Sequence, residues 1–293
     1  MVNPPGERQY IASLTGLRGI AAVLVFLYHY EVLHPGIRLD LAIPWAGKIL
    51  QFPLGFGFAG VDIFFVLSGF LLSLPFALAT TSKQSLPPVR PYFRRRLLRV
   101  FPAYYAQLFI LLAVGGWFVA WQPLGVRTFL AHLVMFFNIG WDPVRPLVGI
   151  WWTLPVEMGF YLILPFLAPF LSPSRWLPVL LVGIAISLAY RAWAGAHFGP
   201  LGSGAAFLAA SQLPGNLAEF MLGASAALLV QWRLLKERPR PAGWVLDLMF
   251  VLGLILPALW LWNVVLPVSA DYWLGHWSMI VGPLVIGLPL SVS

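Results

Sequence analysis

Arg18 and His29 are the residues whose types and spacing most clearly suggest chemistry, because both lie in one apolar segment, SLTGLRGIAAVLVFLYH. They are 11 residues apart. An α-helix turns by about 100° per residue, so they share one helix face, roughly 16 Å apart along its axis. Ionisable groups inside apolar helices are costly, and their default interpretation is functional. The spacing therefore predicts a polar stripe on one face of this helix.

The two side chains suit different tasks. An imidazole exchanges a proton readily near neutral pH, so His29 is a candidate general base. The alternative for His29 is a packing histidine that hydrogen-bonds a neighbouring helix. The guanidinium of Arg18 could meet phosphate charge, and it could equally anchor the helix by extending to the membrane surface.

Two carboxylates are candidate partners for His29. Asp62 lies near the start of the next apolar segment, where it could orient an imidazole, or it could be an interfacial carboxylate that faces water. Glu157 and Tyr161 are one helical turn apart in an apolar segment, and a buried carboxylate there needs a partner such as His29 or an arginine. Ser68 is not predicted to be a nucleophile, because no G-x-S-x-G turn surrounds it.

A run of arginines, FRRRLLRVFPAYY, leads into the third apolar segment. Arg96 and Arg99 have i, i+3 spacing and would share one helix face, where they could clamp phosphates. The alternative is that they only fix the orientation of the segment in the membrane. No pair of histidines with acids at helical spacing is present, so the sequence indicates no metal site.

The composition defines the elements that must position these residues. Of the 293 residues, 60% are hydrophobic and only 10% are charged, whereas soluble domains have about 25% charged residues. The apolar runs are continuous and do not alternate, which favours transmembrane helices over a β-barrel. The net charge of +8 is attributed to basic cytoplasmic loops, and no nucleic-acid partner is expected. Cysteine is absent, which excludes disulfides and thiolate chemistry.

We predict an all-α polytopic membrane protein, a bundle of about eight to ten transmembrane helices forming one domain over residues 1–293. A weaker element at 127–140 is too short to be a secure span. The N-terminus has no features of a cleaved signal peptide. The predicted spans are 13–32, 55–78, 98–120, 151–171, 176–193, 213–232, 244–262 and 274–290.

Basic loops predict the orientation in the inner (plasma) membrane. The stretch 83–99 has six basic residues and no acid, so it is expected in the cytoplasm, as is 233–240. Both stretches fall on that side only if 127–140 does not cross fully. The N-terminus is then cytoplasmic.

Four motifs in order resemble the membrane acyltransferase-3 family, which includes O-antigen and other polysaccharide O-acetylases and macrolide acyltransferases. Arg18 and His29 match its Arg-x10-His pattern, and RRRLLRVFPAYY matches its RxxR segment at Arg96 and Arg99. FFVLSG matches its FFVxSG helix, which includes Ser68. WWTLPVEMGFYLILP is similar to its W-S-L-x-x-E-x-x-F-Y helix. Together the four motifs cover residues 10–170.

The resemblance implies transfer of an acyl group, usually acetyl, from cytoplasmic acyl-CoA to a hydroxyl of a carbohydrate or macrolide-type acceptor. Acyl-CoA would be a substrate, and no permanently bound cofactor is implied. His29 would be the catalytic residue, helped by Asp62 or Glu157 as the orienting carboxylate. The donor-binding residues would be Arg18, Arg96, Arg99 and Ser68.

Three alternatives stay open. The acyl group could pass through a transient acyl-His29 intermediate. A proton-coupled sugar or lipid transporter or flippase would use His29, Asp62 and Glu157 as a proton relay, but the broken paired repeats typical of transporters are not found. A non-catalytic membrane scaffold would have no reason to keep Arg18 and His29 on one face. The sequence does not indicate an oligomeric state.

Overall fold

The computed structural model describes residues 12–34, 38–43, 48–53, 57–118, 125–199 and 204–236. These residues include six helices long and apolar enough to cross a membrane, which confirms the predicted all-α polytopic fold. The spans expected at 244–262 and 274–290 lie outside the described residues. The six candidate spans contain the helices α1 (Ala12–Leu33), α2 (Ala59–Thr81), α3 (Val89–Phe118), α5 (Thr153–Leu167), α6 (Trp176–Phe198) and α8 (Leu217–Leu235). The span that contains α5 is Gly149–Phe170, because short 3₁₀ helices extend α5 at both ends.

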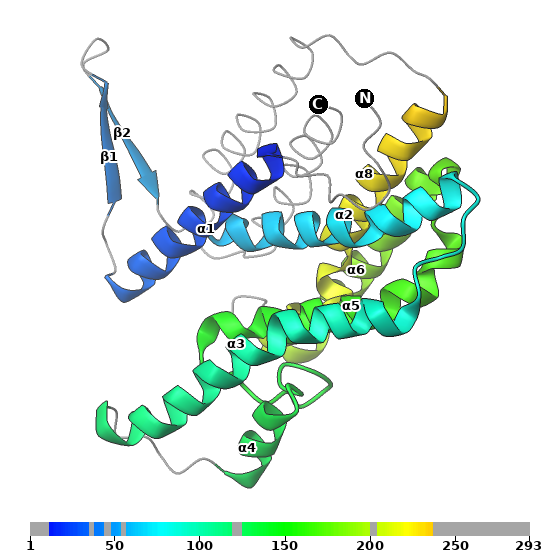
Figure 1. Cartoon of the computed structure of the whole chain (residues 1–293). Helices are drawn as coiled ribbons and strands as arrows, with labels where there is room; N and C mark the ends of the chain where they lie inside the picture. The colour runs from blue at the N-terminus through cyan, green and yellow to red at the C-terminus, as the bar shows by residue number, and fades with distance from the viewer. Residues whose placement is uncertain are drawn as a thin grey trace.

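Shorter elements connect the long helices. Strands β1 (Arg38–Ile43) and β2 (Lys48–Pro53) form an antiparallel hairpin between α1 and α2, a feature that the sequence did not predict. Figure 1 shows this hairpin standing apart from the helices. The short helices are α4 (Val126–Leu133), α7 (Gly204–Ala210), η3 (Gly149–Trp152), η4 (Ala168–Phe170), η5 (Pro173–Arg175) and η6 (Leu213–Asn216).

Helices α2 and α8 form the centre of the bundle because glycines let their backbones touch. A Cβ added at Gly69 would lie 2.1 Å from the Phe220 carbonyl oxygen, and one added at Gly223 would lie 2.0 Å from that of Val66. Small residues at helix crossings allow such close approach in membranes, where packing drives association in place of the hydrophobic effect. Helix α1 meets α2 in the same way, since a Cβ at Gly60 would lie 2.3 Å from the Ala21 carbonyl oxygen.

Stacked aromatic rings join α5 to this centre. The Phe160 ring stacks on Phe220 with centroids 4.3 Å apart, and Phe65 stacks on the same ring at 4.9 Å. All three side chains are buried. Because offset aromatic pairs prefer defined geometries, this stack fixes α5 against α2 and α8.

Helix α4 does not cross the membrane, in agreement with the weak signal at 127–140. Its eight residues span about 12 Å, well short of a hydrocarbon core of about 30 Å. The chain then turns through Met135 and Asn138, both with positive φ. Two hydroxyls of α3 bind the carbonyls that end α4: Tyr104 donates to His132 O at 2.6 Å and Tyr105 to Leu133 O at 2.8 Å.

Helix α3 begins at Val89, nine residues before the predicted start at residue 98. The arginine run is therefore helical and continuous with the apolar part of the helix. The hydropathy pattern missed these residues because arginine lowers local hydropathy, although it is a good helix former.

The close contact between α2 and α8 should make the protein sensitive to any side chain added at Gly69. Gly69→Ala should lower the free energy of unfolding by about 1–3 kcal/mol, because its Cβ would overlap backbone that cannot yield. The matched control is Gly16→Ala in α1, where an added Cβ meets nothing within 4 Å. Denaturant unfolding of the purified proteins in detergent measures both. Equal stability of the two variants would contradict this account of the packing.

Candidate active site

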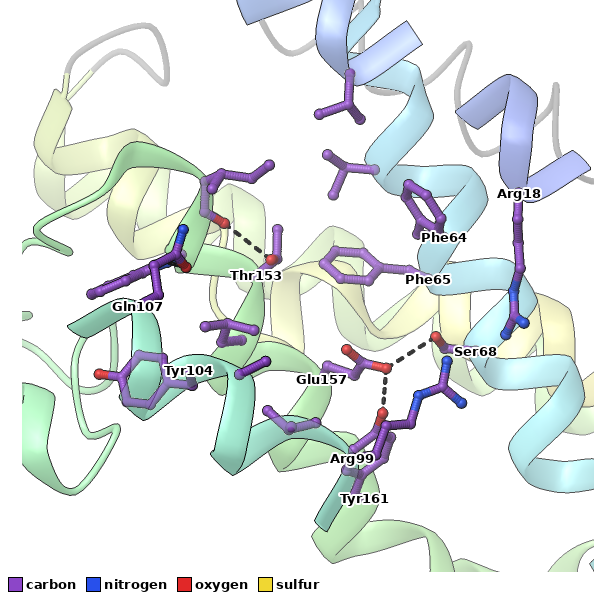
Figure 2. Close-up of a pocket in the computed structure, with 17 residues that line it drawn as sticks. Arg18, Phe64, Phe65, Ser68, Arg99, Tyr104, Gln107, Thr153, Glu157 and Tyr161 are labelled. Atoms are coloured by element: carbon purple, nitrogen blue, oxygen red, sulfur yellow. Dashed lines mark hydrogen bonds between the residues drawn. The ribbon is translucent and has the colours of Figure 1, made fainter. Parts of the chain in front are cut away.

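A cavity of about 530 Å³ lies between α1, α2, α3 and α5. Its walls are mainly apolar, and its polar side chains come from all four helices (Figure 2). The polar or charged residues that line it are Arg18, Ser68, Arg99, Tyr104, Gln107, Thr153, Glu157 and Tyr161.

The Glu157 carboxylate is held by two hydroxyls. Ser68 Oγ donates to Glu157 Oε1 at 3.3 Å, and Tyr161 OH donates to the same oxygen. Tyr161 lies one turn after Glu157 on α5, as the i, i+4 spacing predicted, whereas Ser68 comes from α2. Ser68 therefore serves here as a hydrogen-bond donor that fixes the carboxylate.

Two guanidinium groups converge on the same part of the cavity. Figure 2 shows Arg18, from α1, and Arg99, from α3, extending toward Ser68. The charges of Arg99 and Glu157 both act on Arg18. Two cations and one carboxylate leave an excess positive charge within a mainly apolar cavity, and arginine pairs bind carboxylates and phosphates well. The arrangement is suited to bind an anion.

Arg96 does not line the cavity, although it lies one turn before Arg99. Its guanidinium carbon is 5.7 Å from the centroid of the Tyr161 ring and 6.0 Å from that of Tyr92. These are cation–π distances. Arg96 thus packs behind Tyr161 and supports the residue that holds Glu157.

His29 is not among the residues that line this cavity, although it lies one turn after Val25 on α1. Its Nδ1 is 2.8 Å from the Val25 carbonyl oxygen, and Val25 lines the cavity. Because a carbonyl can only accept, this contact assigns the proton of the neutral imidazole to Nδ1 and leaves its lone pair on Nε2. Neither Asp62 nor Glu157 makes a hydrogen bond or ion pair with His29. The orienting contact expected from a carboxylate is instead made by a backbone carbonyl.

Asp62 belongs to a separate buried group formed by α2, α6 and α8. Arg191 pairs with Glu219 at 3.3 Å and donates to Gly215 O at 2.6 Å and Asn216 Oδ1 at 3.0 Å. The charges of Glu219 and Arg191 both act on Asp62, which is 4% exposed. The structure thus separates Asp62 from the cavity that contains Glu157.

Sequence reasoning missed two residues with polar roles. Arg191 was not recognised, although a lone arginine in the apolar segment AISLAYRAWAG is a signal for a buried ion pair. Gln107 was not recognised either, although it is a polar residue within the apolar stretch AYYAQLFILLAV of α3. The partners of both residues are distant in sequence, so no local spacing pointed to them.

Comparison with known proteins agrees with the motifs. A family model described as an acyltransferase domain matches residues 11–292. The chain therefore belongs to this acyltransferase family, the membrane acyltransferase-3 family that its motifs predicted.

Among curated proteins, the chain is 32% identical over 198 residues to the peptidoglycan O-acetyltransferase OatA of Listeria monocytogenes, covering 62% of this chain and 28% of that protein. It is 26% identical over 201 residues to the O-acetyltransferase OatA of Staphylococcus aureus, covering 61% and 29%. The chain thus matches less than a third of the length of these relatives. No solved structure matches it significantly.

The buried Arg191–Glu219 pair should contribute more to stability than an exposed ion pair does. Arg191→Met should lower the free energy of unfolding by about 3–5 kcal/mol, because it leaves the Glu219 carboxylate buried without its cation. The double variant Arg191→Met/Glu219→Gln should be more stable than Arg191→Met alone. Denaturant titration in detergent micelles provides the measurement.

The control for this pair is Arg127→Met. Arg127 pairs with Asp142 at 2.8 Å, but the side chains are 64% and 84% exposed, and exposed pairs contribute about 0–1 kcal/mol. If Arg191→Met lowered the free energy of unfolding no more than this control, Arg191 would not be needed to neutralise the buried Glu219 carboxylate.

Proposed function

We propose that this protein is a membrane O-acyltransferase that moves an acetyl group from acyl-CoA to a hydroxyl of a cell-envelope carbohydrate. The observation that carries this proposal is the cavity in which Arg18 and Arg99 converge beside the Glu157 carboxylate. Membership of the acyltransferase family and the names of its relatives support the reaction class. The cavity supplies the positive charge that an anionic donor requires.

The donor phosphates would lie against Arg18 and Arg99. Arg96, which contacts the rings of Tyr92 and Tyr161, would extend the positive charge toward the start of α3, and Ser68 would help to hold the site through Glu157. Because acyl-CoA is cytoplasmic, the basic ends of α1 and α3 would face the cytoplasm in the plasma membrane. The short α4 supports this orientation. If α4 does not cross the membrane, the basic end of α8 lies on the cytoplasmic side together with the basic ends of α1 and α3.

His29 would act as the general base. Its Nε2 keeps the lone pair because Nδ1 donates to Val25 O. Nε2 would take the proton of the acceptor hydroxyl as the oxygen attacks the thioester carbonyl carbon. A new C–O ester bond forms, the C–S bond breaks and the CoA thiolate leaves. His29 then gives up the proton that it took, which ends on the CoA sulfur, so the imidazole is neutral again. In this proposal Glu157 positions the donor-side arginines, and Asp62 acts only through the buried group that it joins.

The acceptor is proposed to be a glycan of the envelope. Relatives named for peptidoglycan acetylation support a carbohydrate, and no observation favours a macrolide. Peptidoglycan fragments are therefore the first acceptors to test, with acetyl-CoA as the donor.

His29→Ala should lower acetyl transfer to peptidoglycan fragments by at least about 100-fold, because general-base catalysis typically contributes 10²–10⁴-fold. The matched control is His197→Ala, since the His197 Nδ1 also contacts a carbonyl four residues earlier, Trp193 O at 2.9 Å, but lies far along the chain in α6. Labelled product from purified protein in vesicles is the measurement. Full activity of folded His29→Ala would exclude His29 as the base.

Arg18→Met and Arg99→Met should each raise the KM for acetyl-CoA about 10-fold or more, because a lost charge-assisted hydrogen bond costs about 1.5–3 kcal/mol. Arg95→Met is the control: Arg95 is exposed on the same helix as Arg99 but does not line the cavity. Steady-state kinetics with varied acetyl-CoA give the values. An unchanged KM in both cavity variants would remove these arginines from the donor site.

A further inference from the structure

Gln107 presents its amide group to the cavity in a defined orientation. Trp151 Nε1 donates to Gln107 Oε1 at 2.8 Å. An indole N–H can only donate, so the amide oxygen must face Trp151 and the NH₂ group must point away from it. Gln107 is exposed and lines the cavity. Among the described residues, none accepts a hydrogen bond from its Nε2.

Trp151 can hold this orientation because its own position is fixed. It is 3% exposed, and its ring packs edge-on against Tyr104 with centroids 5.0 Å apart. Tyr104 is in turn fixed by the hydrogen bond from its hydroxyl to His132 O. The amide of Gln107 is therefore oriented before any ligand enters.

The surroundings of Gln107 determine what it could bind. The cavity is also lined by the apolar Ala103, Ile150 and Leu154 and by the uncharged polar residues Tyr104 and Thr153. Gln107 lies eight residues after Arg99 on α3, which is roughly 12 Å along the helix axis. Figure 2 shows Gln107 at one side of the cavity and Arg18 at the other. A phosphate would bind near the arginines, whereas a neutral NH₂ donor among uncharged lining residues suits a neutral acceptor.

We propose that Gln107 Nε2 donates a hydrogen bond to a carbonyl oxygen of the acyl donor, so that Gln107 is a substrate-contacting residue of the transfer reaction. This inference rests on the proposed function. The carbonyl has two possible sources in an acyl-CoA: the thioester itself or an amide of the arm that carries it. A donor preset toward the thioester oxygen would stabilise the negative charge that develops there during attack.

The test uses two replacements of Gln107 in the full chain. Gln107→Glu keeps an oxygen for Trp151 Nε1 but has no N–H to donate, and Gln107→Met keeps the shape without polar atoms. Each should lower kcat/KM for acetyl-CoA about 10-fold, the effect of losing one hydrogen bond of ordinary strength. Trp151→Phe should cause a smaller loss, since it keeps the ring packing but frees the amide to rotate. Gln84→Met, at an exposed glutamine, is the control.

The kinetic constants distinguish the two sources. A lower kcat with an unchanged KM supports contact with the thioester carbonyl, and a higher KM with an unchanged kcat supports contact with an amide carbonyl. Activities are normalised to folded protein from size-exclusion chromatography, because a purely structural role would lower the folded fraction and leave both constants unchanged. Wild-type constants in both Gln107 variants would overturn this inference and leave the proposed function standing. A folded wild-type protein that transfers no acyl group would overturn the proposed function itself.

Discussion

The backbones of α2 and α8 approach so closely that neither Gly69 nor Gly223 has room for a side chain. This contact seals one side of α2 and so determines which residues its other side presents. Val66 and Gly69 face α8, whereas Phe64 and Ser68 line the cavity. In lipid, where apolar side chains gain little by leaving their surroundings, such backbone contact is a main source of helix association. The position of Ser68 beside Glu157 thus depends on glycines that never touch the cavity.

The same helix separates two groups of buried polar residues. On the α8 side, Arg191 and Glu219 form a closed group in which the guanidinium is bound by a carboxylate, an amide and a backbone carbonyl. On the cavity side, Arg18 and Arg99 share space with one carboxylate. The Arg191 guanidinium finds its partners within the protein, which suits a structural role. The open group keeps positive charge that a ligand can neutralise, and for that reason the proposed reaction is placed in the cavity.

The sequence predicted the elements of the site better than their mutual contacts. Hydropathy predicted the long helices, because an apolar run long enough to cross a bilayer is visible in the sequence without knowledge of any contact. The pairing of Glu157 with Tyr161 was predictable because both lie on one helix, one turn apart. The side of α2 on which Asp62 lies was not predictable, since the rotation of a helix about its axis depends on its neighbours. The contact of Gln107 with Trp151 was not predictable either, because the two residues are 44 positions apart in the sequence and lie on different helices. The catalytic role of His29 stays a prediction.

If this cavity supports acyl transfer from acyl-CoA, the acyl group itself can be followed from donor to acceptor. Purified protein in lipid vesicles would receive acetyl-CoA labelled in the acetyl group, together with peptidoglycan fragments as the acceptor. We expect label to appear in an alkali-labile ester on the fragments, with one free CoA released for each acetyl group transferred. Folded protein that leaves all label on CoA, or releases it only as acetate, would show that the cavity does not transfer acetyl groups to the glycan.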